Sequence, residues 1–158
     1  MQVEFINPFL KAVANTFDTM VNCKVERGDI SLVKQGGYSY PVSGVIGLTG
    51  KAVGTVVINL SEDVAIKAAS AMLMMEIQEL NDDVTDAVGE LANMVAGQAK
   101  ADLAEFDMSV SLPNVITGAG HEICFPSNTQ PISVPFDSDF GPLQLVVGLE
   151  VVSEPAGV

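Results

Sequence analysis

The sequence is poor in the residue types on which many enzymes depend. It has no tryptophan, a single histidine (His121) and two cysteines, Cys23 and Cys124, which form no CxxC pattern. A zinc site needs about four close ligands, and a hydrolytic triad needs a histidine with a serine and an acid. We therefore expect neither. We interpret His121 as a turn or surface residue and both cysteines as buried, reduced thiols.

Basic residues are also scarce. Lys and Arg number 7 against 20 Asp and Glu, which gives a formal net charge of −13. The basic residues are scattered, and the net charge repels phosphate backbones and anionic lipid surfaces at long range. We therefore expect no nucleic-acid partner.

Long apolar runs are missing as well. No run reaches the ~18–20 residues needed to span a bilayer. The segment Met1–Phe5 lacks the basic start and apolar stretch of a signal peptide. These features predict no membrane association and a cytoplasmic location.

The chain of 158 residues suits one domain with a substantial core. We predict a single domain over residues 1–152, followed by a flexible C-terminal tail at 153–158. Hydrophobic periodicity and turn signals predict helices over 7–21, 62–75, and from Asn81 or Asp82 to about 105–107. Strands are predicted over 30–35, 38–48, 52–60, 108–112, 121–125, 132–136 and 143–152. Such blocks indicate an α+β fold, a largely antiparallel sheet with helices packed on one face.

Local signals define the helix starts. Asn7 with Pro8 is expected to cap the first helix, Ser61 the second and Asn81 or Asp82 the third. The methionines at 72, 74 and 75 either form a soft binding surface or pack into the core, and we expect core packing.

The third predicted helix has two unlike faces. At about 100° per residue, one broad arc is apolar; it consists of Val84, Val88, Leu91, Ala92, Val95, Ala99, Leu103 and Phe106. The opposite face carries a polar stripe, formed by Asp86, Glu90, Asn93, Gly97 and Lys100. Small residues border it, namely Gly89, Ala96, Ala101 and Ala104. Such a face suits close docking to another protein.

The stripe allows several chemical interpretations. Glu90 and Asn93 can be two ordinary solvated residues. A metal site on Asp86 and Glu90 lacks a visible fourth ligand. The third possibility is that the stripe completes another protein's active site, because an Asn amide has both a donor and an acceptor and can orient a water molecule. A Glu one turn earlier can pair with a cation on that partner.

Several segments together resemble the CheC/CheX/FliY family of chemotaxis phosphatases over nearly the whole chain. The resemblance rests on Phe5–Phe9, on Val42–Gly50, on Gly89–Lys100 with its E-x-x-N motif at Glu90 and Asn93, and on Ser111–Pro113 and Val134–Phe136. It implies hydrolysis of the aspartyl phosphate of a CheY-like response regulator. Asn93 would orient the attacking water and Glu90 would pair with the regulator's lysine.

The same resemblance assigns the surroundings of the site. Asp86 occupies the acid-or-Ser position that opens the motif, and Asp86, Gly89 and Gly97 are expected to contact the partner. Mg²⁺ would be held by the receiver domain, so no cofactor is expected on this chain. A homodimer with one site per subunit is implied. The alternative is a non-catalytic, receiver-binding adaptor or flagellar-switch-associated module.

Overall fold

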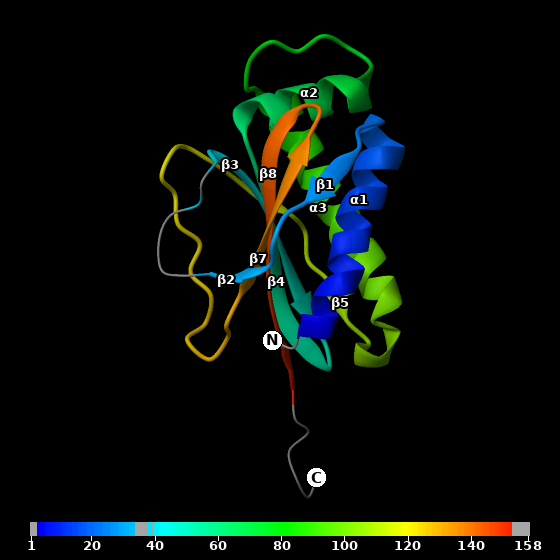
Figure 1. Ribbon diagram of the computed structural model, residues 1–158, viewed down its shortest axis with the longest axis vertical. Helices are drawn as coiled ribbons and strands as arrows, with labels where there is room; N and C mark the ends of the chain where they lie inside the picture. Colours follow the sequence, from blue (N-terminus) through cyan, green and yellow to red (C-terminus); the bar gives the residue numbers. More distant parts are fainter. Residues whose placement is uncertain (1–2, 34–37, 39, 153–158) are drawn as a thin grey trace, which may run out of the picture.

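The computed structural model describes residues 3–33, 38 and 40–152 (Figure 1). The C-terminal tail predicted for 153–158 and residues 34 and 35 of the strand predicted over 30–35 lie outside the described residues. The helices are α1 (Ile6–Val21), α2 (Glu62–Leu73) and α3 (Asp82–Asp102), with short 3₁₀ turns at Val3–Phe5 and Ala104–Phe106. The strands are β1 (Val25–Arg27), β2 (Ser31–Leu32), β3 (Val42–Thr49), β4 (Ala52–Leu60), β5 (Ser109–Val110), β6 (Asn114–Thr117), β7 (Ile132–Ser138) and β8 (Gly141–Val151).

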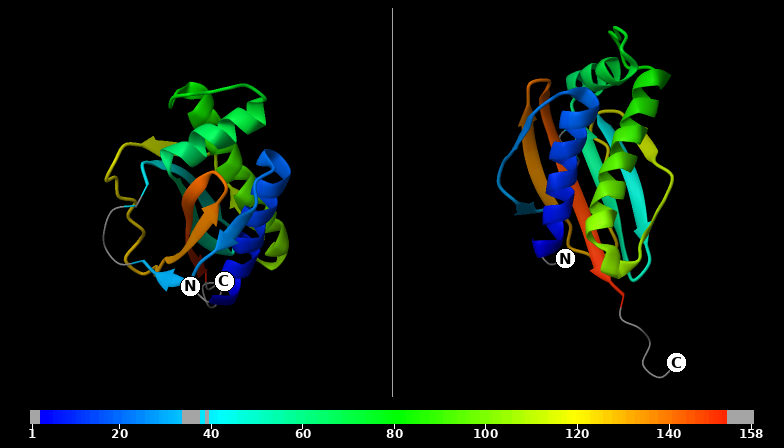
Figure 2. Two further views of the ribbon diagram at one scale, coloured as in Figure 1. Left: turned by 45° about the horizontal axis from the view of Figure 1, so that its top comes forward. Right: turned by 90° about the vertical axis from the view of Figure 1, so that its right-hand side faces the viewer.

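Within the described residues, the strands form one eight-stranded sheet in the order β1-β7-β8-β4-β3-β5, with β2 also on β7 and β6 also on β3. Every pairing is antiparallel. The helices gather on one face of the sheet, with α1 and α3 side by side (Figures 1 and 2). The predicted α+β class, with an antiparallel sheet and helices on one face, is confirmed.

Two of the three helix caps predicted from the sequence are confirmed. The Ser61 side chain accepts a hydrogen bond from the Val64 N–H at 3.2 Å, and Asn81 accepts one from Val84 at 3.0 Å. The Asn7 cap is wrong, because α1 begins at Ile6 and its N-cap is Phe5, two residues before Asn7, with no side-chain cap bond. Asn7 and Pro8 therefore lie in the first turn, where a missing proline N–H costs nothing.

The core lies between the helices and the sheet. Its largest fully buried side chains come from α1, the central strands and α3: Phe9, Phe17, Ile6, Ile46, Leu48, Ile58, Leu60, Leu91, Ile132, Leu143, Leu145 and Leu149. A smaller cluster, centred on Tyr38, Val57 and Val146, covers part of the opposite face of the sheet together with Ile123 and Phe125. Residues 121–125, predicted as a strand, form no regular element and pack on that second face instead.

Two expectations about burial are wrong in part. Met72 packs against the core, but Met74 is 93% exposed and Met75 is also exposed, because α2 ends in a left-handed residue at Met74 and the chain turns outward. Cys23 is a buried free thiol as expected, whereas Cys124 is exposed. No helix within the described residues is long and apolar enough to cross a bilayer.

Candidate functional site on helix α3

The polar stripe of α3 is exposed as the periodicity predicts. Asp86, Glu90, Asn93 and Gly97 all face solvent, while the apolar arc from Val84 to Ala99 is buried. Glu90 and Asn93 are three residues apart, so they are neighbours on one helix face, about 5–6 Å apart at Cβ. In Figure 2, right, α3 stands at the front of the molecule with this length of helix uncovered.

A glycine on β3 sets how deeply α3 sits on the sheet. A Cβ at Gly44 would lie 2.9 Å from the Ala92 Cβ and 3.3 Å from the Val88 Cγ1. Only a residue without a side chain lets the helix approach this closely, so Gly44 and Ala92 fix α3 against β3. The position of the stripe is therefore determined by tight backbone packing directly behind it.

The structure corrects the expected role of Gly89. Gly89 and Ala96 are buried, although the helical phase predicts both among the small residues of the docking face. A Cβ at Gly89 would lie 3.3 Å from the Pro113 Cγ and 3.6 Å from Val115. The chain between β5 and β6 therefore covers this side of α3, and Gly89 serves packing within the protein. Gly97, by contrast, has no heavy atom within 4 Å of its ideal Cβ and lies open on the stripe.

The other side of α3 is bounded by α1. Asn15 of α1 donates a hydrogen bond to the Gln98 side chain at 2.9 Å, and Lys11 lies 3.6 Å from the Asp102 carboxylate. Both contacts are exposed, so each contributes little to the free energy of unfolding. Figure 2, right, shows α3 between α1 on one side and the β5–β6 chain on the other. The stripe is thus a ridge with two defined borders.

The stripe presents exposed polar side chains and does not form an enclosed pocket. Among the described residues, no hydrogen bond or ion pair holds the side chains of Glu90 or Asn93. The same residues contain no group of three or more potential metal ligands. A convex face with a carboxylate and an amide one turn apart cannot enclose a small substrate, but it can insert both groups into a cleft of another protein.

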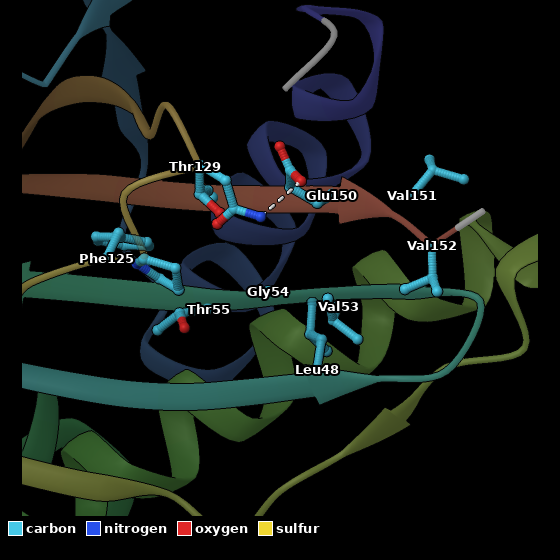
Figure 3. A pocket seen from close by; sticks show the side chains of 12 residues that line it. Leu48, Val53, Gly54, Thr55, Phe125, Thr129, Glu150, Val151 and Val152 are labelled. Carbon is cyan, nitrogen blue, oxygen red and sulfur yellow. Dashed lines mark hydrogen bonds between the residues drawn. The ribbon is translucent and has the colours of Figure 1, made fainter. Parts of the chain in front are cut away.

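The hollow shown in Figure 3 lies apart from this stripe. Phe125 and Thr129 lie over Gly148 of β8, where a Cβ would meet both side chains at 2.7 Å. Asn128 donates a hydrogen bond to Glu150 at 3.3 Å at its edge. Its walls include Val53, Thr55 and the chain at 125–129, and none of the stripe residues lines it.

One close pair of chemically active side chains was not predicted from the sequence. His121 Nε2 lies 2.7 Å from Ser43 Oγ, its Nδ1 lies 2.7 Å from the Gly118 carbonyl, and Asn59 donates to Ser43 Oγ at 2.8 Å. Ser43 has no exposed surface, so no substrate reaches its hydroxyl. The half-buried His121 also stacks on Tyr38 at 5.8 Å between ring centroids. The pair therefore pins the 118–123 chain to the sheet and is no nucleophile.

Burial raises the pKa of the Tyr38 phenol to about 12, and the nearby Cys124 adds to the rise. Tyr38 therefore stays neutral across the physiological pH range and acts as an apolar platform for His121. No signal in the sequence could have paired Ser43 with His121, because 78 positions separate them.

Comparison with known proteins identifies the family. The family model described as "Chemotaxis phosphatase CheX" matches residues 42–137. The CheY-P phosphatase CheX of Thermotoga maritima is 30% identical over 121 residues, which are 75% of this chain and 78% of the relative. This chain belongs to the CheX family of chemotaxis phosphatases.

Solved CheX structures match the structure of this chain over almost its full length. The chemotaxis protein CheX of Desulfovibrio desulfuricans is 33% identical with a TM-score of 0.86, covering 94% of this chain and 100% of its own. CheX of Vibrio vulnificus is 35% identical with the same TM-score of 0.86 and the same coverage of 94% and 100%. The CheX match over 42–137 contains all of α3, so the stripe lies inside the family region.

Proposed function

We propose that this protein hydrolyses the aspartyl phosphate of a CheY-like response regulator, with α3 completing the active site on the regulator. The observation that carries the proposal is the exposed pair Glu90 and Asn93 on a helix that Gly44 seats firmly on the sheet. Membership of the CheX family and the 30% identity to a CheY-P phosphatase support the substrate class.

Each side chain has a distinct role in this proposal. The Glu90 carboxylate pairs with the regulator's lysine and fixes the position of the helix. Asn93, one turn further along α3, then extends its amide beside the phosphoryl group. The carbonyl oxygen of this amide accepts a hydrogen bond from water, and its NH₂ donates to a phosphoryl oxygen, which orients the water for in-line attack.

The proposed hydrolysis needs no nucleophile from this chain, because water attacks the phosphorus. The oxygen of water forms a bond to phosphorus as the bond between phosphorus and the aspartyl oxygen breaks. The products are the aspartate carboxylate and inorganic phosphate, and the water proton passes to solvent or to phosphate. We propose that the Mg²⁺ for this step is held by the acids of the regulator, and that no cofactor binds this chain.

Docking must depend on short-range contacts. This chain carries a formal net charge of −13, so attraction of an acidic partner at long range is weak or adverse. An exposed Gly97 one turn beyond Asn93 allows the regulator's backbone to approach α3 closely. We further propose that Asp86 contacts the regulator, that the protein acts in the cytoplasm, and that it does so as a homodimer with one stripe per subunit.

The decisive experiment compares Asn93→Ala with Asn128→Ala. Asn128 is an exposed asparagine at the edge of the hollow, apart from the stripe, so its replacement is a matched control. Phosphorylated regulator and Mg²⁺ are mixed with each variant, and phosphate release is followed. We expect Asn93→Ala to lose most of kcat while keeping its affinity for the phosphorylated regulator, and Asn128→Ala to match the unmodified protein.

The outcomes separate mechanism from function. Full turnover by Asn93→Ala would show that the amide does not orient the water. If the unmodified protein binds regulators regardless of phosphorylation and accelerates the loss of phosphate from none of them, it is an adaptor.

A further inference from the structure

Leu112 is a large, exposed apolar residue on the segment that packs against α3 through Pro113. It is 87% exposed and immediately precedes Pro113, the residue that packs on Gly89 of α3. Gly89 is adjacent in sequence to Glu90 and one turn before Asn93. The segment 111–113 therefore borders the same ridge that carries the proposed chemistry.

The segment is a bulge at the edge of the sheet. Val110 pairs with Leu48, and Asn114 pairs with Val45. Three residues thus lie between the pairs on the edge strand, where β3 has only two. The extra residue displaces Leu112 and Pro113 from the regular ladder. Bulges at sheet edges commonly redirect side chains next to active sites.

The bulge is held rigidly by Ser111. The Ser111 N–H donates to the Gly47 carbonyl at 2.9 Å, and the Gly47 N–H donates to Ser111 Oγ at 2.8 Å. The Ser111 hydroxyl in turn donates to the Leu112 carbonyl at 2.9 Å. Leu112 is therefore presented from a fixed backbone, so little conformational entropy of the loop is lost when a partner covers it.

The helix geometry places Pro113, and with it the backbone of the adjacent Leu112, on the Asn93 side of the ridge. Pro113 covers Gly89 and, at 100° per residue, the Gly89 side of α3 is nearer to Asn93 than to Glu90. A regulator domain that contacts Glu90 and accommodates the Asn93 amide also covers segment 111–113 if its surface continues past Asn93. The β5–β6 chain runs alongside α3 there (Figure 2, right).

We propose that Leu112 is a third docking point for the regulator and packs against an apolar surface patch beside the phosphorylated aspartate. This inference rests on the proposed function, since it takes the regulator as the occupant of the ridge. Glu90 and Asn93 alone define a line about which a partner can tilt. An apolar contact to one side of that line opposes the tilt and so strengthens binding of the regulator to the ridge.

The test uses two exposed leucines of the same sheet. Leu32 is 62% exposed on β2, which pairs with β7 at the opposite edge, so Leu32→Ala is a matched control for Leu112→Ala. Binding to a regulator in which beryllium fluoride and Mg²⁺ mimic the phosphorylated aspartate is measured by calorimetry, separately from phosphate release. We expect Leu112→Ala to weaken binding about tenfold, with KM raised in proportion and kcat within about twofold. Leu32→Ala should change neither quantity.

Two results would overturn the inference. The first is equal binding by Leu112→Ala and the unmodified protein, which leaves the proposed function intact if turnover persists. The second is a Leu112→Glu variant whose mass in sedimentation drops to half, because a second copy of this chain would then cover the leucine. Failure of the proposed function has a separate readout, since it appears as absent turnover in the unmodified protein.

Discussion

Gly97 lies in the interior of α3 with its Cα open to solvent, where an ordinary helix would carry alanine or a longer side chain. No heavy atom lies within 4 Å of the position that a Cβ would occupy. Glycine in a helix interior costs stability relative to alanine, because more backbone entropy is lost on folding. Nothing within the described part of the fold requires this glycine, so we attribute it to the docking surface.

The substitution Gly97→Ala should therefore have opposite effects on stability and activity. Without a clash, it should raise the free energy of unfolding by about 0.4–1 kcal/mol. For a chain of this size that corresponds to a rise in Tm of a few degrees, at about 2–4 °C per kcal/mol. The added methyl lies one turn from Asn93 on the stripe. Inserting it into a close contact costs about 1 kcal/mol or more, which is about fivefold in KM for the phosphorylated regulator.

Thermal unfolding and steady-state phosphate release on the same preparation measure both quantities. A variant with a higher Tm and an unchanged KM would refute the docking role of Gly97. A variant with a lower Tm would refute the structural argument, because it would show that the position is not open. Ala101→Gly, one turn further along the exposed face, provides the reverse change and should lower Tm.

Three further substitutions test the site and its support. Gly44→Ala places a Cβ 2.9 Å from the Ala92 Cβ and should lower the free energy of unfolding by about 1–3 kcal/mol. Urea denaturation measures this loss, and an unchanged midpoint of urea unfolding would contradict the close packing of α3 on the sheet. Glu90→Lys reverses the charge that meets the regulator's lysine, so KM in the phosphatase assay should rise by at least about tenfold with little change in kcat. An unaltered KM would exclude the ion pair between Glu90 and that lysine. His121→Ala leaves the buried Ser43 hydroxyl without its ring partner and should cost about 1–3 kcal/mol while sparing kcat. Loss of turnover in a stable His121→Ala protein would instead make that pair catalytic.

Much of the fold is visible in local sequence signals. Ser61 and Asn81 cap their helices because their side-chain oxygens reach the N–H group three residues on. The β3–β4 hairpin turns at Gly50, whose φ of +150° is a conformation that other residues rarely adopt. These features depend on neighbours along the chain, so the sequence predicts them directly. The Asn7 cap fails because a 3₁₀ turn at Val3–Phe5 leads into α1 and starts the helix earlier.

Long-range packing accounts for the errors. Gly89 and Ala96 have the helical phase of a partly exposed flank, yet both are buried, and at Gly89 the cover is the β5–β6 bulge. The periodicity of α3 contains no information about a chain that arrives from the edge of the sheet. Likewise, His121 follows a turn as expected, but its partner Ser43 is brought to it only by the pairing of β3 within the sheet.

The sequence by itself determines which residues of α3 face outward, because a helix repeats every 3.6 residues and its apolar arc must be buried. It therefore identifies Glu90, Asn93 and Gly97 as one exposed stripe. Only the tertiary structure decides how wide that stripe is and what borders it. Gly44 sets its depth, α1 bounds one side, and the bulge that presents Leu112 bounds the other. These contacts join segments far apart in the chain, so they exist only once the sheet has formed.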